Sequence, residues 1–337
     1  MRLATYNVEW FANLFDDGDR LLVDDAPSGR EGVTRAQQVE ALGIVFTALD
    51  ADAVLIIEAP NTGRKQDTVR ALTGFAEAFD LRARAAVIGF ANETHQEIAL
   101  LYDPDALSAR HDPRGDETGR KGSGDAPRFD GTFRIDLDID NTEDLVRFSK
   151  PPLELEVTTA AGMTLRLIGA HLKSKAPHGA RGRDAVMRLS ISNRRKQLAQ
   201  AIWIRQRIEA HRAEGLPVIL AGDLNDGPGL DDFEDLFGRS SVEILLNEDM
   251  YDPHARKALS RRLGAFPSTA RFRMPDGSRY LQALLDYIMV SPELMGRRPA
   301  WRIWHPFDDV RCFETPELRE ALLAASDHFP VTLDIEL

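Results

Sequence analysis

The sequence predicts an α+β layered sandwich, and the spacing of its apolar residues carries this prediction. Short runs of β-branched and apolar residues recur along the whole chain, whereas long helical patterns are few and lie apart from one another. Strands and helices in separate places favour packed layers over a regular alternation of strand and helix. The predicted strands are 3–8, 53–57, 85–90, 97–102, 133–139, 153–157, 165–171, 217–221, 284–290 and 330–335.

Three stretches have the apolar spacing of helices, namely 34–49, 67–79 and 183–212. The last is the longest, and Gly215 and Pro217 end it. Stretches rich in Gly, Asp and Pro at 16–32 and 112–130 predict long surface loops, and 247–277 predicts an irregular insertion. Such long loops are uncommon unless they serve a site or are disordered.

Composition predicts a cytoplasmic protein. The chain has 337 residues and is 43% hydrophobic, so it can bury a large core. No apolar run approaches the roughly 20 residues of a membrane span. A strand pattern begins at Arg2, which leaves no room for a secretory leader. The single cysteine, Cys312, excludes an intramolecular disulfide and fits a reducing compartment.

The net charge of -12 argues against a protein that binds long nucleic acids electrostatically over its whole surface. Two local basic runs, 173–195 and 256–273, remain able to line a groove. An acidic chain also suits a protein that gathers carboxylates around divalent cations. Trp203, Trp301 and Trp304 are predicted to be core residues.

Six apolar runs each end in, or carry, polar groups able to bind a metal or a phosphate. They are 5–10 (TYNVEW), 55–58 (LIIE), 168–174 (IGAHLKS), 221–225 (AGDLN), 284–288 (LLDYI) and 326–330 (SDHFP). Each alone has an ordinary explanation, such as the turn that Asp and Asn favour. Six together favour a single active site.

In their order along the chain and in their residues, these segments resemble the motifs of the endonuclease/exonuclease/phosphatase superfamily. This superfamily includes pancreatic deoxyribonuclease, abasic-site endonucleases, sphingomyelinases, inositol-polyphosphate phosphatases and deadenylases. The GDLN run at 222–225 and the SDHFP run at 326–330 are the most specific pieces. The resemblance spans Asn7 to His328, which implies a single catalytic domain over 1–337. It also implies a four-layer α/β/β/α sandwich with two packed, mostly antiparallel sheets (deoxyribonuclease I-like).

The resemblance implies a metal site that holds Mg²⁺ or Mn²⁺. Glu58 resembles the principal metal ligand. Asp327 would bind or orient near the metal, and Glu9 stands where some members carry an acidic residue. A hard cation with few carboxylates and several waters suits phosphoryl chemistry.

The resemblance also implies catalytic roles. His328 would orient or deprotonate the attacking water while Asp286 holds its imidazole, and Asp223 would lie beside the nucleophile. Whether Asp223 or His328 is the general base stays open. Asn7 and Asn225 would donate hydrogen bonds to the phosphate oxygens.

His171 resembles the second histidine of the deoxyribonuclease and sphingomyelinase branches, a phosphate stabiliser or leaving-group acid. Glu97 is the expected partner of His171, although a solvated carboxylate is an equal alternative. The chain departs from the family pattern at Ile57, where glutamine is common, and at Asp103, where deoxyribonucleases have arginine. Lys150, which precedes a predicted strand, offers a replacement cation.

The function implied is a metal-dependent phosphoesterase that hydrolyses a phosphodiester, with a nuclease acting on DNA or RNA as the leading interpretation. A sphingomyelinase-like or phosphoinositide-phosphatase-like hydrolase of a lipid or small phosphoester is the alternative. A catalytically silent scaffold on the same fold is a third, against which the intact set of site residues argues. No obligate protein partner is evident. Internal versus terminal cleavage, the number of metals and the oligomeric state stay open.

Overall fold

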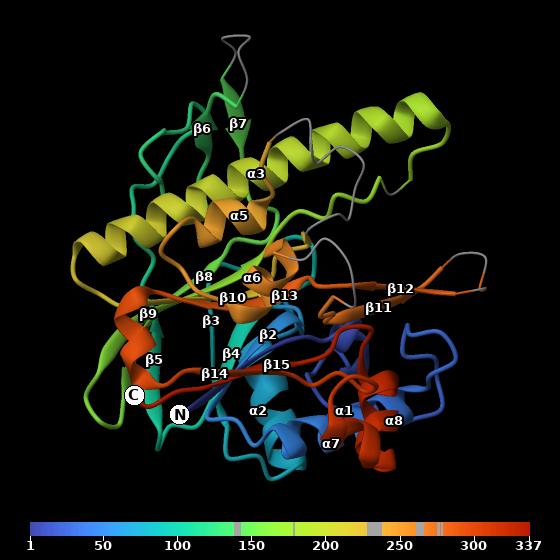
Figure 1. Ribbon diagram of the computed structural model, residues 1–337. Coiled ribbons are helices and arrows are strands. Elements are labelled where there is room, and N and C mark those ends of the chain that lie inside the picture. The colour runs from blue at the N-terminus through green and yellow to red at the C-terminus, as the bar shows by residue number, and fades with distance from the viewer. Residues whose placement is uncertain (138–142, 178, 228–237, 261–265, 275–276, 278) are drawn as a thin grey trace.

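The protein folds into two large β-sheets packed face to face, with helices on both outer sides (Figure 1). The computed structural model describes residues 1–137, 143–177, 179–227, 238–260, 266–274, 277 and 279–337. The layers are therefore helix, sheet, sheet, helix, an α+β sandwich as predicted. Within the described residues, no helix is both long and apolar enough to cross a membrane.

The first sheet has the order β14 (Ala300–Ile303), β15 (Val331–Asp334), β1 (Arg2–Asn7), β2 (Ala53–Ala59), β4 (Glu97–Tyr102) and β3 (Ala85–Ile88). The second has the order β13 (Asp286–Val290), β10 (Val218–Asp223), β9 (Thr164–His171), β8 (Leu153–Thr159) and β5 (Leu107–His111). Neighbouring strands are antiparallel except that β1 pairs with β2, and β9 with β10, in parallel. Two further antiparallel strand pairs form small sheets of their own. They are β6 (Phe133–Ile135) with β7 (Asp144–Val146), and β11 (Ala270–Arg273) with β12 (Tyr280–Ala283).

Helices α1 (Arg35–Leu49), α2 (Thr68–Ala78), α7 (Val310–Glu314) and α8 (Pro316–Ala325) lie on the side of the first sheet. Helices α3 (Arg183–Ala213) and α5 (Ser241–Leu246) lie on the side of the second (Figure 1). The remaining elements are α6 (Pro253–Ser260) and the short 3₁₀ helices η1 (Phe11–Leu14) and η2 (Pro292–Arg297).

Alternating side chains divide the core into three layers. In β2, Val54 and Ile56 pack among the residues of α1 and α2, whereas Leu55 and Ile57 pack between the sheets. Successive side chains of a strand point to opposite faces, so a strand that is covered on both faces must be apolar throughout. At Gly169 the two sheets approach closely, because an added Cβ would lie 2.6 Å from Cδ1 of Leu55.

Local capping explains why the predicted helices begin where they do. The hydroxyl of Thr34 accepts a hydrogen bond from the backbone N–H of Gln37, and the side-chain oxygen of Gln37 accepts one from the backbone N–H of Thr34, so α1 begins at Arg35. Asp67 caps α2 in the same position by accepting from the backbone of Arg70. These two helices and α3 lie within one residue of the predicted limits.

Several elements differ from the prediction. The stretch 247–277, expected to be irregular, contains α6 and β11. Strand β6 ends at Ile135 rather than at residue 139, which lies outside the described residues. Strands β5, β7, β12 and β14 and helices α5, α7 and α8 were not predicted.

Candidate active site

Polar side chains converge where two parallel strand pairs end. Asn7 ends β1 and Glu58 lies near the end of β2, in the first sheet. In the second sheet His171 and Asp223 end β9 and β10 and are directly opposite each other in register. Parallel neighbours end at the same sheet edge, which explains why residues far apart in sequence meet here. Asp286 begins the antiparallel β13 opposite Asp223.

Except for Asp286, these residues line one cleft of about 800 Å³. Of the residues predicted for the site, those lining the cleft are Asn7, Glu9, Glu58, His171, Asp223, Asn225, Asp327 and His328. Asp286 lies behind His328 and reaches the cleft through it.

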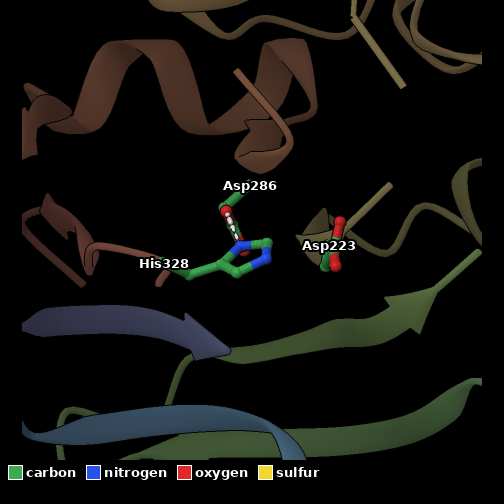
Figure 2. A group of neighbouring side chains, drawn as sticks. All are labelled: Asp223, Asp286 and His328. Carbon is green, nitrogen blue, oxygen red and sulfur yellow. Dashed lines mark hydrogen bonds and ion pairs between the residues drawn. The ribbon is translucent and has the colours of Figure 1, made fainter. Parts of the chain in front are cut away.

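His328 and Asp286 form a buried pair. Nδ1 of His328 lies 2.7 Å from Oδ2 of Asp286 (Figure 2). Burial lowers the pKa of His328, but the charge and hydrogen bond of Asp286 outweigh it, so this pKa lies well above its ordinary value. Figure 2 shows Asp223 across the ring from Asp286, toward the second nitrogen of the imidazole. One ligand atom from each of the three residues lies within 4.8 Å of the others.

Thr269 holds Asp286 in place, and sequence reasoning missed it. Its hydroxyl donates to Oδ2 of Asp286 at 2.8 Å and accepts from the backbone N–H groups of Leu285 and Asp286 at 3.0 Å. The carboxylate oxygen that faces His328 is therefore fixed from behind. A lone threonine in a Pro-Ser-Thr-Ala run carries no signal that could have identified it.

Asp223 is held by two asparagines. Nδ2 of Asn7 donates to Oδ2 of Asp223 at 3.0 Å, and Nδ2 of Asn225 donates to the same oxygen at 3.2 Å. The backbone of Asn225 donates to Oδ1 at 2.8 Å. Burial and the neighbouring charge of Asp286 raise the pKa of Asp223 to about 7. This carboxyl can therefore accept or release a proton near neutrality.

The backbone around Asp223 has an unusual shape. Gly222 has φ +130°, and an added Cβ would lie 2.0 Å from the carbonyl oxygen of Ala170, so only glycine fits. Asn225 has φ 49°, in the left-handed region that asparagine tolerates better than most residues. The GDLN sequence thus turns the chain sharply while it presents both polar side chains to the cleft.

Glu58 lies at a β-bulge with a left-handed backbone. Its φ is 62°, and the register between β2 and β4 shifts between Ile57 and Ala59. Bulges re-aim a side chain, and strained backbone of this kind concentrates at functional sites. Oε1 of Glu58 lies 3.9 Å from Nε2 of His171. Burial raises the pKa of Glu58, and the charge of Lys150 works in the opposite direction.

Lys150, not Glu97, is the partner of His171. Nζ of Lys150 lies 3.0 Å from Nε2 and 3.1 Å from Nδ1 of the imidazole. Burial and the charge of Lys150 hold the pKa of His171 well below its ordinary value, so the ring is neutral. Lys150, which was expected to provide a cation just before a predicted strand, therefore lies inside the cleft.

The predicted pairing of Glu97 with His171 is wrong. Glu97 is buried and accepts from the side chain of Asn92 at 2.8 Å and from the backbone of Thr62 at 3.4 Å. Among the described residues, it makes no hydrogen bond with His171. Asn92 lies in the loop between β3 and β4 and Thr62 in the loop between β2 and α2, so this carboxylate joins those two loops.

Glu9 and Asp327 add two carboxylates beside Glu58. Glu9 pairs with Arg30 and accepts from Nε1 of Trp10 at 2.9 Å. Burial and the charge of Asp327 raise the pKa of Glu9 to about 7. Oδ1 of Asp327 lies 4.0 Å from Nε2 of His328.

The donor set fits a hard divalent cation. Glu9, Glu58, Asp223 and Asp327 crowd negative charge into one cleft, and three of them have raised pKa values. Oδ1 of Asn7 and Oδ1 of Asp286 are buried with no hydrogen-bond partner among the described residues. Carboxylate and amide oxygens are the ligands that Mg²⁺ and Mn²⁺ prefer.

A two-sheet sandwich with a cleft of buried carboxylates, histidines and asparagines is the arrangement of a phosphoester hydrolase. The sequence profile of the Endonuclease/Exonuclease/phosphatase family matches residues 4–328. The chain therefore belongs to this family of metal-dependent phosphoester hydrolases.

Solved structures share the fold at low sequence identity. Truncated TDP2 from Caenorhabditis elegans is 12% identical with a TM-score of 0.51, over 100% of this chain and 97% of that one. A humanized TDP2 from D. rerio is 11% identical with a TM-score of 0.52, over 100% and 99%. A mannosyl-6-phosphatase from Bacteroides thetaiotaomicron is 17% identical with a TM-score of 0.50, over 100% of both chains. Comparison with curated protein sequences finds no match.

Proposed function

We propose that this chain is a metal-dependent phosphodiesterase that cleaves DNA or RNA by attack of water on phosphorus. The whole chain acts as one catalytic domain. The observation that carries the proposal is the buried His328–Asp286 pair, which faces Asp223 in the same cleft as Glu58 and Lys150.

In this reaction a bond forms between the oxygen of water and phosphorus, and the bond from phosphorus to the leaving oxygen breaks. The proton of the attacking water passes to the His328–Asp223 pair, whose pKa values are both displaced toward or above neutrality, and the pair returns a proton to the leaving oxygen, which departs as an alcohol. Asp286, fixed by Thr269, holds Nδ1 of His328 and thereby turns Nε2 of the ring to the cleft.

The remaining groups stabilise the phosphate. Nδ2 of Asn7 and Nδ2 of Asn225 both donate to Asp223 in this structure and would turn a donor to the phosphate oxygens when substrate binds, and Lys150 brings a cation to neutral His171. Groups held in place before the reaction stabilise charge as it develops in the transition state. Glu58, with Asp327 and Glu9 beside it, would hold Mg²⁺ or Mn²⁺, which would offset negative charge on the phosphate oxygens.

Two features support a nucleic-acid substrate. The family name itself includes endonucleases and exonucleases. The wall of the cleft that follows β9 carries Lys173 and Lys175 beside Lys150. Lys175 pairs with Asp226, whereas Lys173 has no acidic partner within 4 Å among the described residues. Lys173 is therefore placed to bind an anion such as a second phosphate.

A lipid or small phosphoester is the second candidate, and the rim of the cleft favours it. Leu281 and Phe272 from the β11–β12 hairpin line the cleft, and Leu281 is 47% exposed. An exposed apolar rim would contact an apolar group attached to the phosphate.

A substrate panel tests the proposal. The protein is incubated with plasmid, single-stranded DNA, RNA, sphingomyelin and bis-nitrophenyl phosphate, each with Mg²⁺, Mn²⁺ or EDTA. Metal-dependent cleavage of DNA or RNA, lost in His328→Ala, supports the nuclease. Hydrolysis of sphingomyelin without cleavage of nucleic acid selects the lipid substrate, and inactivity on every substrate supports a scaffold.

A further inference from the structure

Trp10 differs from the other three tryptophans of the chain because it is exposed at the active site. Trp203 and Trp304 are buried, and half-buried Trp301 donates its N–H to the carbonyl of Ile288 at 2.7 Å. Trp10 is 48% exposed and lines the catalytic cleft. A large aromatic face left open to water beside catalytic groups needs a reason.

The ring of Trp10 is held in one orientation. Its Nε1 donates to Oε1 of Glu9 at 2.9 Å, and Arg30 fixes the other oxygen of the same carboxylate. Gly29 lies against the ring, since an added Cβ would come within 2.7 Å of Cγ of the indole. The long loop that includes Gly29 and Arg30 therefore supports the indole from beneath.

The backbone of Trp10 is strained. Its φ of 60° and ψ of 22° lie in the left-handed region, which glycine and asparagine ordinarily occupy. A bulky residue in this conformation persists where the surrounding structure imposes it, and such positions cluster at functional sites. Trp10 therefore combines an exposed ring, a fixed ring orientation and a strained backbone at the wall of the cleft.

We propose that Trp10 is a stacking platform for the nucleobase of the nucleotide that carries the scissile phosphate. This inference rests on the proposed nuclease function and narrows its substrate class. The carboxylate of Glu9, which accepts from the indole, experiences the charges of Asp327 and Glu58 and lines the same cleft, so one side chain separates the ring from the proposed metal site. Every base has a π-face, and base–aromatic stacking binds single-stranded nucleic acid with little sequence preference.

A base can stack on Trp10 only when it is not paired within a duplex. The inference therefore selects single-stranded DNA or RNA, or an unpaired terminal nucleotide, over a continuous double helix. A lipid head group has no planar ring to stack on the indole, and a choline head group would contact it through its cationic ammonium instead.

The test compares two single-stranded oligonucleotides of equal length and charge, one with thymine on every sugar and one with abasic sugars throughout. Their KM values are measured for the wild type and for Trp10→Leu, Trp10→Phe and Trp10→Gly. Glycine relieves the left-handed backbone, so its effect reports on the ring and not on strain. Phe313→Leu is the matched control, because Phe313 is 50% exposed but lies outside the cleft.

We expect wild type and Phe313→Leu to have a KM about 10-fold lower for the thymine substrate than for the abasic one. Trp10→Leu and Trp10→Gly lose this preference, and Trp10→Phe keeps most of it. A preference that persists in Trp10→Leu and Trp10→Gly overturns the inference, and so does its absence from the wild type.

A binding measurement separates this inference from the function on which it rests. Tryptophan fluorescence is followed in His328→Ala with Mg²⁺ during titration with thymidine monophosphate, and then with ribose phosphate. Quenching by the nucleotide alone, absent when Trp10→Phe is added, supports stacking even if no nucleic acid is cleaved. Equal responses to the two ligands overturn it even if the protein proves to be a nuclease.

Discussion

The hydroxyl of Thr269 donates to the same carboxylate oxygen of Asp286 that faces Nδ1 of His328. Thr269→Val keeps the shape of this side chain but removes its hydrogen bonds. We expect kcat to fall about 10-fold with little change in KM, because the imidazole loses its fixed support. Thr269→Ser should restore most of the activity.

A buried threonine outside the cleft provides the control for Thr269. Thr332 accepts from Nε1 of Trp304 at 3.0 Å. Thr332→Val should lower the melting temperature without a specific loss of kcat. Equal kcat in Thr269→Val and wild type would show that this threonine does not support catalysis.

Glu58→Gln preserves the size of the side chain and removes its charge. Since burial raises the pKa of Glu58, the charged form opposes folding, and the variant should melt at an equal or higher temperature without metal. Added Mg²⁺ or Mn²⁺ should stabilise the wild type, by about 2.7 kcal/mol at a hundredfold excess over Kd, but not the variant. Metal-dependent turnover should be lost. Glu97→Gln, at a buried glutamate outside the cleft, should keep both the stabilisation by metal and the metal-dependent turnover.

Lys150→Met tests the cation beside His171. The change removes the charge but retains an unbranched side chain, and we expect turnover to fall about 100-fold because a preorganised cation is lost. Lys150→Arg should retain part of the activity, and Lys121→Met, at an exposed lysine outside the cleft, should retain all of it. Steady-state kinetics on one phosphodiester substrate decides between these outcomes. Full activity in Lys150→Met would remove this residue from the mechanism.

Cys312 should resist thiol reagents in the folded protein. Its side chain is buried, and burial together with Asp309 raises the pKa of the thiol to about 12. Because the thiolate is the reactive form, iodoacetamide at pH 8 should leave Cys312 unmodified until the chain unfolds. Mass spectrometry before and after addition of denaturant measures this. Rapid alkylation under native conditions would contradict the packing around α7.

His254 should make stability depend on pH. Burial, reinforced by Lys257, lowers the pKa of His254 to about 4, compared with about 6.5 in the unfolded chain. Between these values the unfolded state binds more protons, so this residue's contribution to stability falls as the pH drops from about 6.5 to 4. His254→Gln should flatten the dependence of melting temperature on pH. His95→Asn, at an exposed histidine, should leave the slope unchanged.

The sequence predicted elements that are covered on both faces better than those at the margins. Strands β2, β4, β9 and β10 are buried apolar runs and stand out from their surroundings. Strand β5 at the sheet edge alternates buried Leu107 with exposed Ser108 and Arg110, and so does not read as a continuous apolar run. The missed helices α5 and α7 are only 6 and 5 residues long, too short to show a helical period.

Site residues at strand ends were predictable because their chemistry stands out against the apolar strand before them. The partners of those residues were not, because a hydrogen bond depends on loops whose paths the sequence does not reveal. Glu97 was assigned to His171, but Asn92 and Thr62 satisfy it. The proposed roles of Thr269 and Trp10 depend on local geometry: Thr269 accepts from two backbone N–H groups, and Trp10 has a left-handed backbone.

The hydrogen bond from Asn7 to Asp223 joins one sheet to the other, so the two halves of the site come from separate layers. Neither layer contains a working set of groups alone, and their alignment is determined by the apolar residues between them. A side chain at Gly169, which lies outside the cleft, would collide with Leu55 and Ile98 of the first sheet. We therefore expect substitutions in this interior to change the geometry of the proposed site as well as the stability of the fold.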